Sequence, residues 1–249
     1  MKKYFCIFSL ALISLILGGC LSITRASPEL ETGKSFVVLS FDDGPNMYGD
    51  STARLLDLLK KYNIHAMFAL LGENAEQNPE LARRIRDEGH IIINHGYSAK
   101  WASGMGDEEF RENLEKGEAA IAGALGEAFL PKLYRPHGGF YTKRQEEIWT
   151  AAGWTMVAGG IRAYDAVLGE KDKEKVVRQI IQKTEKNGGG IILLHDGRDS
   201  QQSIKAKLEG PNGAKNLSGP YNRSWIADAT EEIIAALLEK GYIFKMPVY

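Results

Sequence analysis

Two adjacent aspartates, Asp42 and Asp43, follow the apolar run Ser35–Phe41 and precede Gly44 and Pro45. The run predicts a buried strand, and the glycine and proline predict a turn that leaves both carboxylates accessible. We expect the two side chains to point in different directions, so that one carboxylate can bind a metal ion while the other accepts a proton. Taken alone, this tetrapeptide fits a solvent-facing turn better, because aspartate and glycine are common there.

Further ionisable side chains follow other predicted strands. His95, Arg135 and His195 each stand just after an apolar run, as Asp42 does. Strands and helices alternate along the chain, which favours a parallel sheet with helices outside it. The carboxyl ends of such strands meet at one rim, so we expect these groups to lie together. The predicted strands are Ser35–Phe41, Ile64–Leu71, Ile91–Ile93, Lys132–Tyr134, Trp154–Val157, Gly190–His195 and Tyr242–Phe244.

Helices are predicted between these strands from apolar spacing and from residues that begin or end a helix. Asp50 or Ser51 is expected to cap the first helix, and Pro79 to open the next, which Gly89 closes. The other predicted helices begin at Asp107 or span about 143–152, 172–186 and 227–240.

The segments around the polar residues resemble the signatures of one family. Ser40–Pro45, Gly89–His95, Tyr134–Gly139 and Gly190–Asp196 are similar, in order and spacing, to the first, second, third and fifth signatures of the polysaccharide deacetylase family. This family is also called the NodB-homology domain or carbohydrate esterase family 4. The resemblance implies an α/β fold, a distorted (β/α) barrel with fewer strands than a full barrel. It also implies hydrolysis of N-acetyl groups from a sugar, commonly N-acetylglucosamine in a polymer.

The resemblance implies a role for each matching residue. Asp42 corresponds to the general base that deprotonates the attacking water, and Arg135 to the arginine that orients this base. Asp43 and His95 correspond to metal ligands. His195 corresponds to the general acid that protonates the leaving amine, a step suited to a group that titrates near neutrality.

The fourth signature matches only loosely. Asp165 is the one acidic residue placed to support His195, and the other acidic position of the family falls on Gly160 or Arg162. The third signature further implies substrate contacts for Tyr134, Pro136 and Gly138.

The metal motif is incomplete. In the family a second histidine stands four residues after the first, and here that position holds Ala99. A catalytic metal usually has three protein ligands, so we expect a divalent metal, with zinc favoured, to be weakly held or absent. His137 stands where the family usually has proline. It is either a replacement ligand, a substrate contact or a partly exposed loop residue, whereas His65 and His90 begin their strands and are predicted to be structural.

Residues 1–19 are predicted to be a signal peptide. Two lysines precede an uncharged apolar run that is short for a membrane span. The small residues before Cys20 resemble a lipobox, which implies cleavage before Cys20 and its diacylation. An uncleaved anchor helix and plain secretion are the alternatives. Residues 20–34 would then form the lipidated cysteine and a tether, and 35–249 the folded domain of an exported, membrane-anchored lipoprotein on the extracytoplasmic side.

Composition limits the partners. The formal net charge of −1 argues against nucleic acid, which needs a basic surface. The only cysteines are Cys6 and Cys20, so the mature domain has no disulfide. We expect an N-acetylated polysaccharide or peptidoglycan as substrate and the membrane as a partner through the lipid anchor. Trp101 and Trp225 are either sugar-stacking candidates or core residues. The polar stretch 197–221 is either a cleft border or a tolerated surface insertion.

Three possibilities remain open from the sequence, and the third keeps catalysis but changes the substrate or the set of metal ligands, with His137 as a ligand. The first is a metal-dependent N-deacetylase acting on an N-acetylglucosamine-containing glycan of the cell envelope, which is favoured because both the proposed base and the proposed acid are present. The second is a glycan-binding lipoprotein that has the same fold without turnover, which Ala99 and the weak fourth signature favour.

Overall fold

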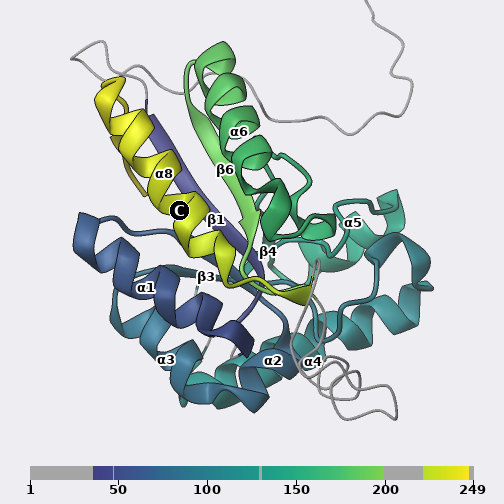
Figure 1. Ribbon diagram of the computed structural model, residues 1–249. Helices are drawn as coiled ribbons and strands as arrows, with labels where there is room; N and C mark the ends of the chain where they lie inside the picture. Colours follow the sequence, from purple (N-terminus) through teal and green to yellow (C-terminus); the bar gives the residue numbers. More distant parts are fainter. Residues whose placement is uncertain (1–35, 47, 129–130, 199–220, 247–249) are drawn as a thin grey trace, which may run out of the picture.

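A computed structural model describes residues 36–46, 48–128, 131–198 and 221–246 (Figure 1). The predicted signal peptide, Cys20 and the tether lie outside the described residues, as does most of the polar stretch 197–221. Within the described ranges, no helix is long and apolar enough to cross a membrane.

Seven strands form one parallel sheet. Their order is β5-β4-β3-β2-β1-β6, with β7 beside the start of β1. The sheet has helices against it, so its central strands are nearly continuous apolar runs that are buried along their length. The strands are β1 (Phe36–Gly44), β2 (Met67–Leu70), β3 (Ile91–Asn94), β4 (Leu133–Tyr134), β5 (Thr155–Met156), β6 (Gly190–His195) and β7 (Ile243–Phe244).

The segment that follows β5, at one end of this strand order, pairs with β6 at the other end. Ile161 forms a parallel bridge with Ile192 of β6. Its N–H donates to the carbonyl of Ile191 at 2.6 Å, and its carbonyl accepts from the N–H of Leu193 at 2.8 Å. The sheet thus curls towards closure with fewer than eight strands, and the predicted distorted (β/α) barrel is confirmed.

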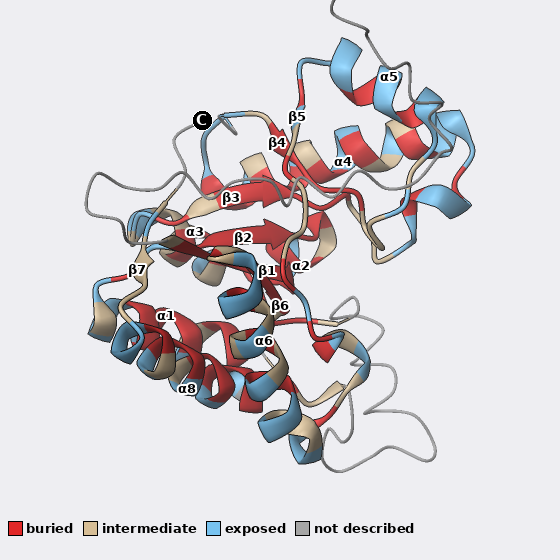
Figure 2. Cartoon of the chain, turned by 90° about the horizontal axis from the view of Figure 1, so that it is seen from above, coloured by how far each residue is buried: buried red, intermediate tan, exposed pale blue. Residues whose placement is uncertain are grey.

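Helices cover the outside of the sheet. Figure 1 shows α8 in front of β1 and α6 beside β6, and α8 also packs on α1 and α6. Figure 2 shows their inner faces buried and their outer faces exposed, as expected for amphipathic helices. The helices are α1 (Ser51–Tyr62), α2 (Gly72–Gln77), α3 (Pro79–Asp87), α4 (Asp107–Leu125), α5 (Lys143–Ala151), α6 (Lys173–Asn187) and α8 (Trp225–Glu239), with 3-10 turns η1 (Tyr48–Asp50), η2 (Ala102–Gly104), η3 (Asp165–Val167) and η4 (Glu170–Asp172).

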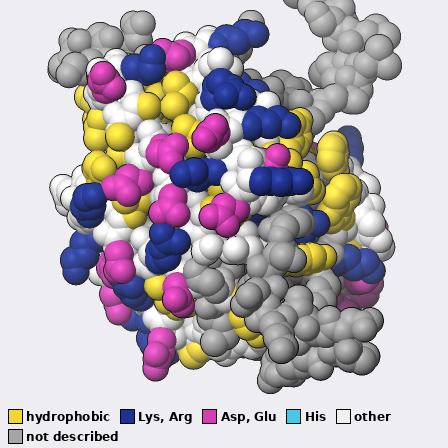
Figure 3. Space-filling view, viewed as in Figure 1, with side chains coloured by type: hydrophobic (Ala, Val, Ile, Leu, Met, Phe, Trp, Pro, Cys, Tyr) yellow, Lys and Arg dark blue, Asp and Glu magenta, His cyan; other side chains and the backbone are white. Residues whose placement is uncertain are grey.

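Most of the predicted helices agree with the structure, with two differences. Pro79 opens α3 as expected, but Asp50 makes no capping hydrogen bond to α1 and instead ends η1 in a left-handed conformation. The short helix α2 was not predicted, because six residues are too few to show a helical period. On the face seen in Figure 3, side chains of both charges are interspersed, in keeping with the small net charge.

Candidate active site

A β-bulge at the end of β1 brings Asp42 and Asp43 to the same side of the sheet. The pairing of β1 with β2 slips between Asp42 and Gly44, and Asp43 has a left-handed backbone with φ of 73°. Successive side chains of a regular strand point to opposite faces, but a bulge re-aims them. Both carboxylates face His95, whose Nε2 lies 3.6 Å from Asp42 Oδ2 and 3.4 Å from Asp43 Oδ1. The expectation that they point in different directions is therefore wrong.

Arg135 binds the other oxygen of Asp42. Its Nη1 donates to Asp42 Oδ1 and, at 2.8 Å, to Ser40 Oγ, while its Nε donates to the carbonyl of Val157 at 3.1 Å. The Arg135 and Asp42 side chains are almost fully buried, where an unpaired charge would be costly. Arg135 thus fixes the orientation of Asp42 and leaves Oδ2 directed towards His95.

Asp43, His95 and His137 form a cluster that could hold a metal ion. One ligand atom from each lies within 4.8 Å of the other two. His137 Nε2, like His95 Nε2, is 3.4 Å from Asp43 Oδ1. Asp43 Oδ1 is buried and has no hydrogen-bond partner of ordinary geometry, a costly arrangement unless a cation or proton lies there.

The backbone prepares His95 as a ligand. Its Nδ1 lies 2.8 Å from the carbonyl oxygen of Arg135, which can only accept a hydrogen bond. The proton of a neutral ring is therefore on Nδ1, and the lone pair of Nε2 faces Asp43. Metal-binding histidines are commonly oriented by such a bond.

The charges of this cluster favour a cation. Burial alone would raise the pKa of Asp43, but contacts with His137 and His95 hold it well below its usual value. Burial would lower the pKa of His137, yet its contact with Asp43 raises it. Both shifts favour positive charge beside Asp43, so the residues present fit a divalent metal ion chemically.

His195 lies beside this cluster and is fixed by Asp165. His195 and Asp42 are paired across β6 and β1. Asp165, which is fully buried, binds His195 twice: Oδ1 lies 3.1 Å from Nδ1, and Oδ2 accepts the backbone N–H at 2.9 Å. Burial lowers the pKa of His195, but the charge of Asp165, with smaller effects of Asp43 and Asp42, raises it to about 9. The ring is thus held protonated near neutral pH.

Arg223 is a residue that the sequence did not single out. It is fully buried, and its Nη2 donates to Asp165 Oδ2 at 2.6 Å and to the His195 carbonyl at 2.9 Å. Its Nη1 donates to the carbonyl of Asp165 at 2.8 Å. An arginine in a polar segment before a helix gives no local signal of burial, so only the fold reveals that it anchors the partner of His195.

Comparison with known proteins agrees with this geometry. The family model described as polysaccharide deacetylase matches residues 29–157, more than half of the chain. The chain belongs to the polysaccharide deacetylase family. This assignment confirms the resemblance of its signatures to NodB-homology and carbohydrate esterase family 4 proteins.

Individual members of the family show the extent of the likeness. A peptidoglycan-N-acetylglucosamine deacetylase of Bacillus cereus is 37% identical over 132 residues, 53% of this chain and 46% of that relative. A chitooligosaccharide deacetylase of Sinorhizobium fredii is 27% identical over 90% of this chain and 96% of its own length. Among solved structures, a peptidoglycan N-acetylglucosamine deacetylase is 30% identical with a TM-score of 0.65, covering 88% of this chain and 87% of that chain.

A histidine from another loop lies close to the signature that lacks its second histidine. Ala99 offers no ligand atom, whereas His137 comes from the loop after β4 and has a side chain only 12% exposed. Its ring centroid lies 5.1 Å from that of His95. His137 is thus a loop residue of intermediate burial, and its contact with Asp43 is also compatible with a replacement ligand.

Some predicted substrate contacts lie away from the protein surface. Tyr134 is 1% exposed and packs in the core against Trp149, with ring centroids 5.5 Å apart. Pro136 is buried as well. Trp225 is 1% exposed at the start of α8. The side chain of Tyr134 therefore belongs to the core, which corrects its assignment to substrate. Of the two alternatives for Trp225, the structure favours the core, while Gly138 is only partly buried.

Close packing leaves no room for a side chain at Gly160, one of the two candidates for the other acidic position of the fourth signature. A Cβ on Gly160 would lie 2.0 Å from the carbonyl oxygen of Ile191. The close approach follows from the bridge between Ile161 and β6, so this position cannot carry an acidic side chain without a shift of the backbone. Among the described acidic residues of this loop, Asp165 is the one that hydrogen-bonds to His195.

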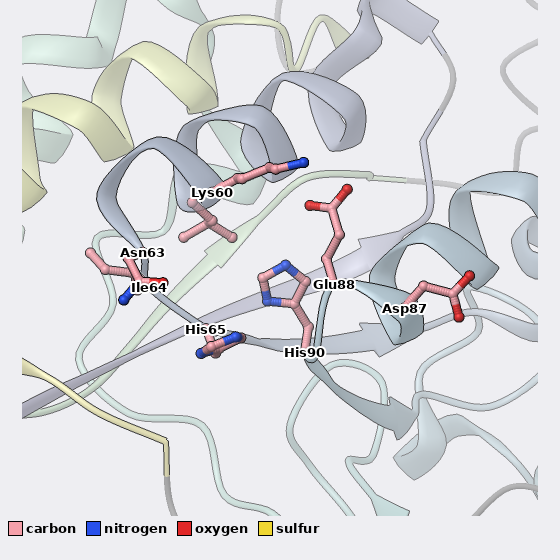
Figure 4. Close-up of a pocket in the computed structure, with 8 residues that line it drawn as sticks. Lys60, Asn63, Ile64, His65, Asp87, Glu88 and His90 are labelled. Carbon is pink, nitrogen blue, oxygen red and sulfur yellow. The ribbon is translucent and has the colours of Figure 1, made fainter.

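His90 is structural, as expected. The backbone N–H of Ala66 donates to its Nδ1 at 3.1 Å, so a neutral ring carries its proton on Nε2 and has no lone pair for a metal. Burial, with the nearby His65, lowers the pKa of His90 to about 4. Figure 4 shows it in a pocket with Lys60, Glu88 and His65, near the amino ends of β2 and β3 and thus at the opposite end of the sheet from Asp42.

Proposed function

We propose that this protein is a metal-dependent hydrolase that removes N-acetyl groups from an N-acetylglucosamine-containing glycan of the cell envelope. The observation that carries the proposal is the placement of Asp42 and His195 on neighbouring strands beside the Asp43–His95–His137 cluster. A base, an acid and a metal-binding site then adjoin one another. The deacetylases to which the chain is similar act on peptidoglycan or chitooligosaccharides.

Asp43, His95 and His137 would hold the metal. One carboxylate and two imidazoles leave an open position and suit zinc among the divalent ions. When bound, the metal would polarise the acetyl carbonyl and acidify a water molecule. The incomplete family motif would then be compensated by His137 rather than lost.

The remaining steps are proton transfers by residues of the chain. Asp42 Oδ2 would take a proton from the attacking water, since Oδ1 is held by Arg135. As the carbon–nitrogen bond breaks, the amine nitrogen would take a proton from His195. This proton must come from Nε2 because Nδ1 is bound to Asp165. Acetate and a free amino sugar are the products.

Release of acetate from tetra-N-acetylchitotetraose tests the proposal. We expect release in the presence of zinc or cobalt, and a loss of at least about 100-fold in Asp42→Asn, because general base catalysis contributes 10²–10⁴-fold. Asp87→Asn is a matched control, because this carboxylate is exposed and pairs with Arg86 on the surface. Absence of release from the wild-type protein with every divalent metal would refute the proposal.

A second candidate is a glycan-binding protein with the same fold and no turnover. It is favoured by Ala99 and by the Gly160 or Arg162 that stands at the other acidic position of the fourth signature, and a shared fold does not by itself imply activity. It predicts saturable binding of the tetrasaccharide without acetate release. Restoration of release by Ala99→His alone would support this candidate over the first.

We also propose that the protein acts outside the cytoplasm, held to a membrane by lipid on Cys20. Support comes from the sequence before residue 35, where small residues precede Cys20 at the end of an apolar run. A lipid chain contributes about 0.8 kcal/mol per buried methylene. Such an anchor would place the site within reach of cell-envelope glycan.

A further inference from the structure

Exposed apolar side chains gather around the candidate active site. Five large hydrophobic residues in the described part of the chain are exposed, and four of them lie on the loops that follow β3, β4 and β5 at the site rim. Only one lies elsewhere, on α8. The four are Trp101 (58% exposed), Phe140 (58%), Tyr164 (66%) and Val167 (64%), and the fifth is Leu238 (44%). Their concentration at the rim needs an explanation, because exposed aromatic residues grouped at one place commonly mark a binding surface.

Trp101 and Phe140 form one apolar surface. Their ring centroids lie 6.4 Å apart and their planes are inclined by 29°. Trp101 also lies against Gly138: a Cβ there would be 2.9–3.2 Å from the indole ring. The absence of a side chain at Gly138 therefore makes room for the indole. We call Trp101 and Phe140 the aromatic pair.

The aromatic pair is held firmly next to the proposed metal site. The N–H of Ala102 donates to the carbonyl of His137 at 3.1 Å. Gln145 Nε2, which is buried, donates to the carbonyls of Ala102 at 2.7 Å and Met105 at 3.2 Å. The loop that carries Trp101 is thus tied both to a proposed ligand and to α5. Trp101 is therefore exposed on a loop that hydrogen bonds hold in place.

We propose that the aromatic pair is a stacking subsite for a pyranose ring next to the one that carries the reacting acetyl group. The inference rests on the proposed deacetylase function. One face of a pyranose ring presents C–H groups that pack on an aromatic face, while its hydroxyls stay in water. A flat, exposed aromatic surface at a hydrolytic centre suits this amphipathic ligand. The site would then select glycan chains over single sugars.

The test compares Trp101→Ala and Phe140→Ala with Leu238→Ala, a matched loss of an exposed apolar side chain on the far helix α8. Substrates are tetra-N-acetylchitotetraose and N-acetylglucosamine. For the tetrasaccharide we expect kcat/KM to fall roughly tenfold in each aromatic variant, mainly through KM, as for an anchoring aromatic residue. Turnover of the monosaccharide should not change, and Leu238→Ala should match wild type with both substrates.

Two results would overturn the inference. One is an equal fall in kcat/KM for the monosaccharide and the tetrasaccharide, which would mean that the aromatic pair supports the catalytic residues rather than a neighbouring sugar. The other is an unchanged kcat/KM for the tetrasaccharide. Calorimetric binding of the tetrasaccharide to Asp42→Asn protein, with and without Trp101→Ala, separates this inference from the proposed function. If wild type releases no acetate but Trp101→Ala still weakens binding, the subsite stands and the deacetylase function falls; absence of any binding removes the subsite.

Discussion

Asp43 is the residue on which the charge balance of the site depends. Its buried Oδ1 faces two imidazoles that come from the loops after β3 and β4. The low pKa of Asp43 and the raised pKa of His137 show that positive charge is favoured between them. A metal ion binds only the unprotonated imidazole of His137, so metal and protons compete for this ring and metal binding should weaken as the pH falls.

At this scale we predict that His137→Ala loses metal affinity. The variant removes one of three proposed ligands. Removal of a residue that only orients a ligand typically lowers metal affinity 10–100-fold, so we expect a larger fall in affinity here. Zinc or cobalt titration against a chelating indicator measures it. His65→Ala is the control, because its exposed ring lies at the opposite end of the sheet. Unchanged affinity in His137→Ala would exclude this residue as a ligand.

The bulge at the end of β1 is the element that makes the site. A regular strand would direct Asp42 and Asp43 to opposite faces. The left-handed conformation of Asp43 is sparsely populated for a residue other than glycine and costs about 1–3 kcal/mol. Close packing of the next strand end holds it: the N–H groups of Asp196 and Gly197 donate to the carbonyl of Asp42.

At the scale of elements we predict that Gly197→Ala disrupts the bulge. Its Cβ would lie 2.2 Å from the carbonyl oxygen of Asp43, a backbone atom that cannot move aside alone. We expect lower metal affinity and a loss of about 1–3 kcal/mol in the free energy of unfolding, as for overpacked sites.

The matched control is Gly123→Ala in α4, where a Cβ meets no atom within 4 Å. There alanine should stabilise the helix slightly, because glycine is a poor helix former. Zinc titration and urea unfolding of both variants are the measurements. If Gly197→Ala binds metal and unfolds like wild type, the bulge does not depend on this close approach.

On the scale of the whole molecule, strand order determines which groups meet. Because β6 pairs with β1 and the segment after β5 bridges β6, loops distant in the sequence converge at one rim. Asp165 and Arg223 reach His195 from two such loops. The rim also carries the aromatic pair, so the proposed catalysis and glycan binding would share one surface of the domain.

For the whole chain we predict that Cys20 determines its location. Wild-type protein expressed with its N-terminal segment in a bacterium should incorporate labelled palmitate and enter the detergent phase of a Triton X-114 extract. Cys20→Ala should lose both properties, since it removes the proposed acylation site. Cys6→Ala, within the predicted signal peptide, is the control and should behave as wild type. Palmitate-free wild-type protein in the aqueous phase would contradict the anchor.

The sequence alone predicted the strands, the parallel α/β class and most residues of the site. It could do so because apolar runs and the glycines and prolines that end them are local signals. The signature residues also stand directly after those runs. The sequence therefore already predicts that Asp42, Arg135, His95 and His195 lie at one rim.

Only the tertiary structure decided which of these residues touch. The bulge that turns Asp42 and Asp43 to one side, the approach of His137 to Asp43, and the burial of Arg223 against Asp165 all depend on contacts between distant segments. The same holds for Tyr134 and Trp225, whose aromatic side chains fit a sugar site or a core equally well until their surroundings are known. Burial is a property of packed neighbours, so the sequence around a residue does not determine it.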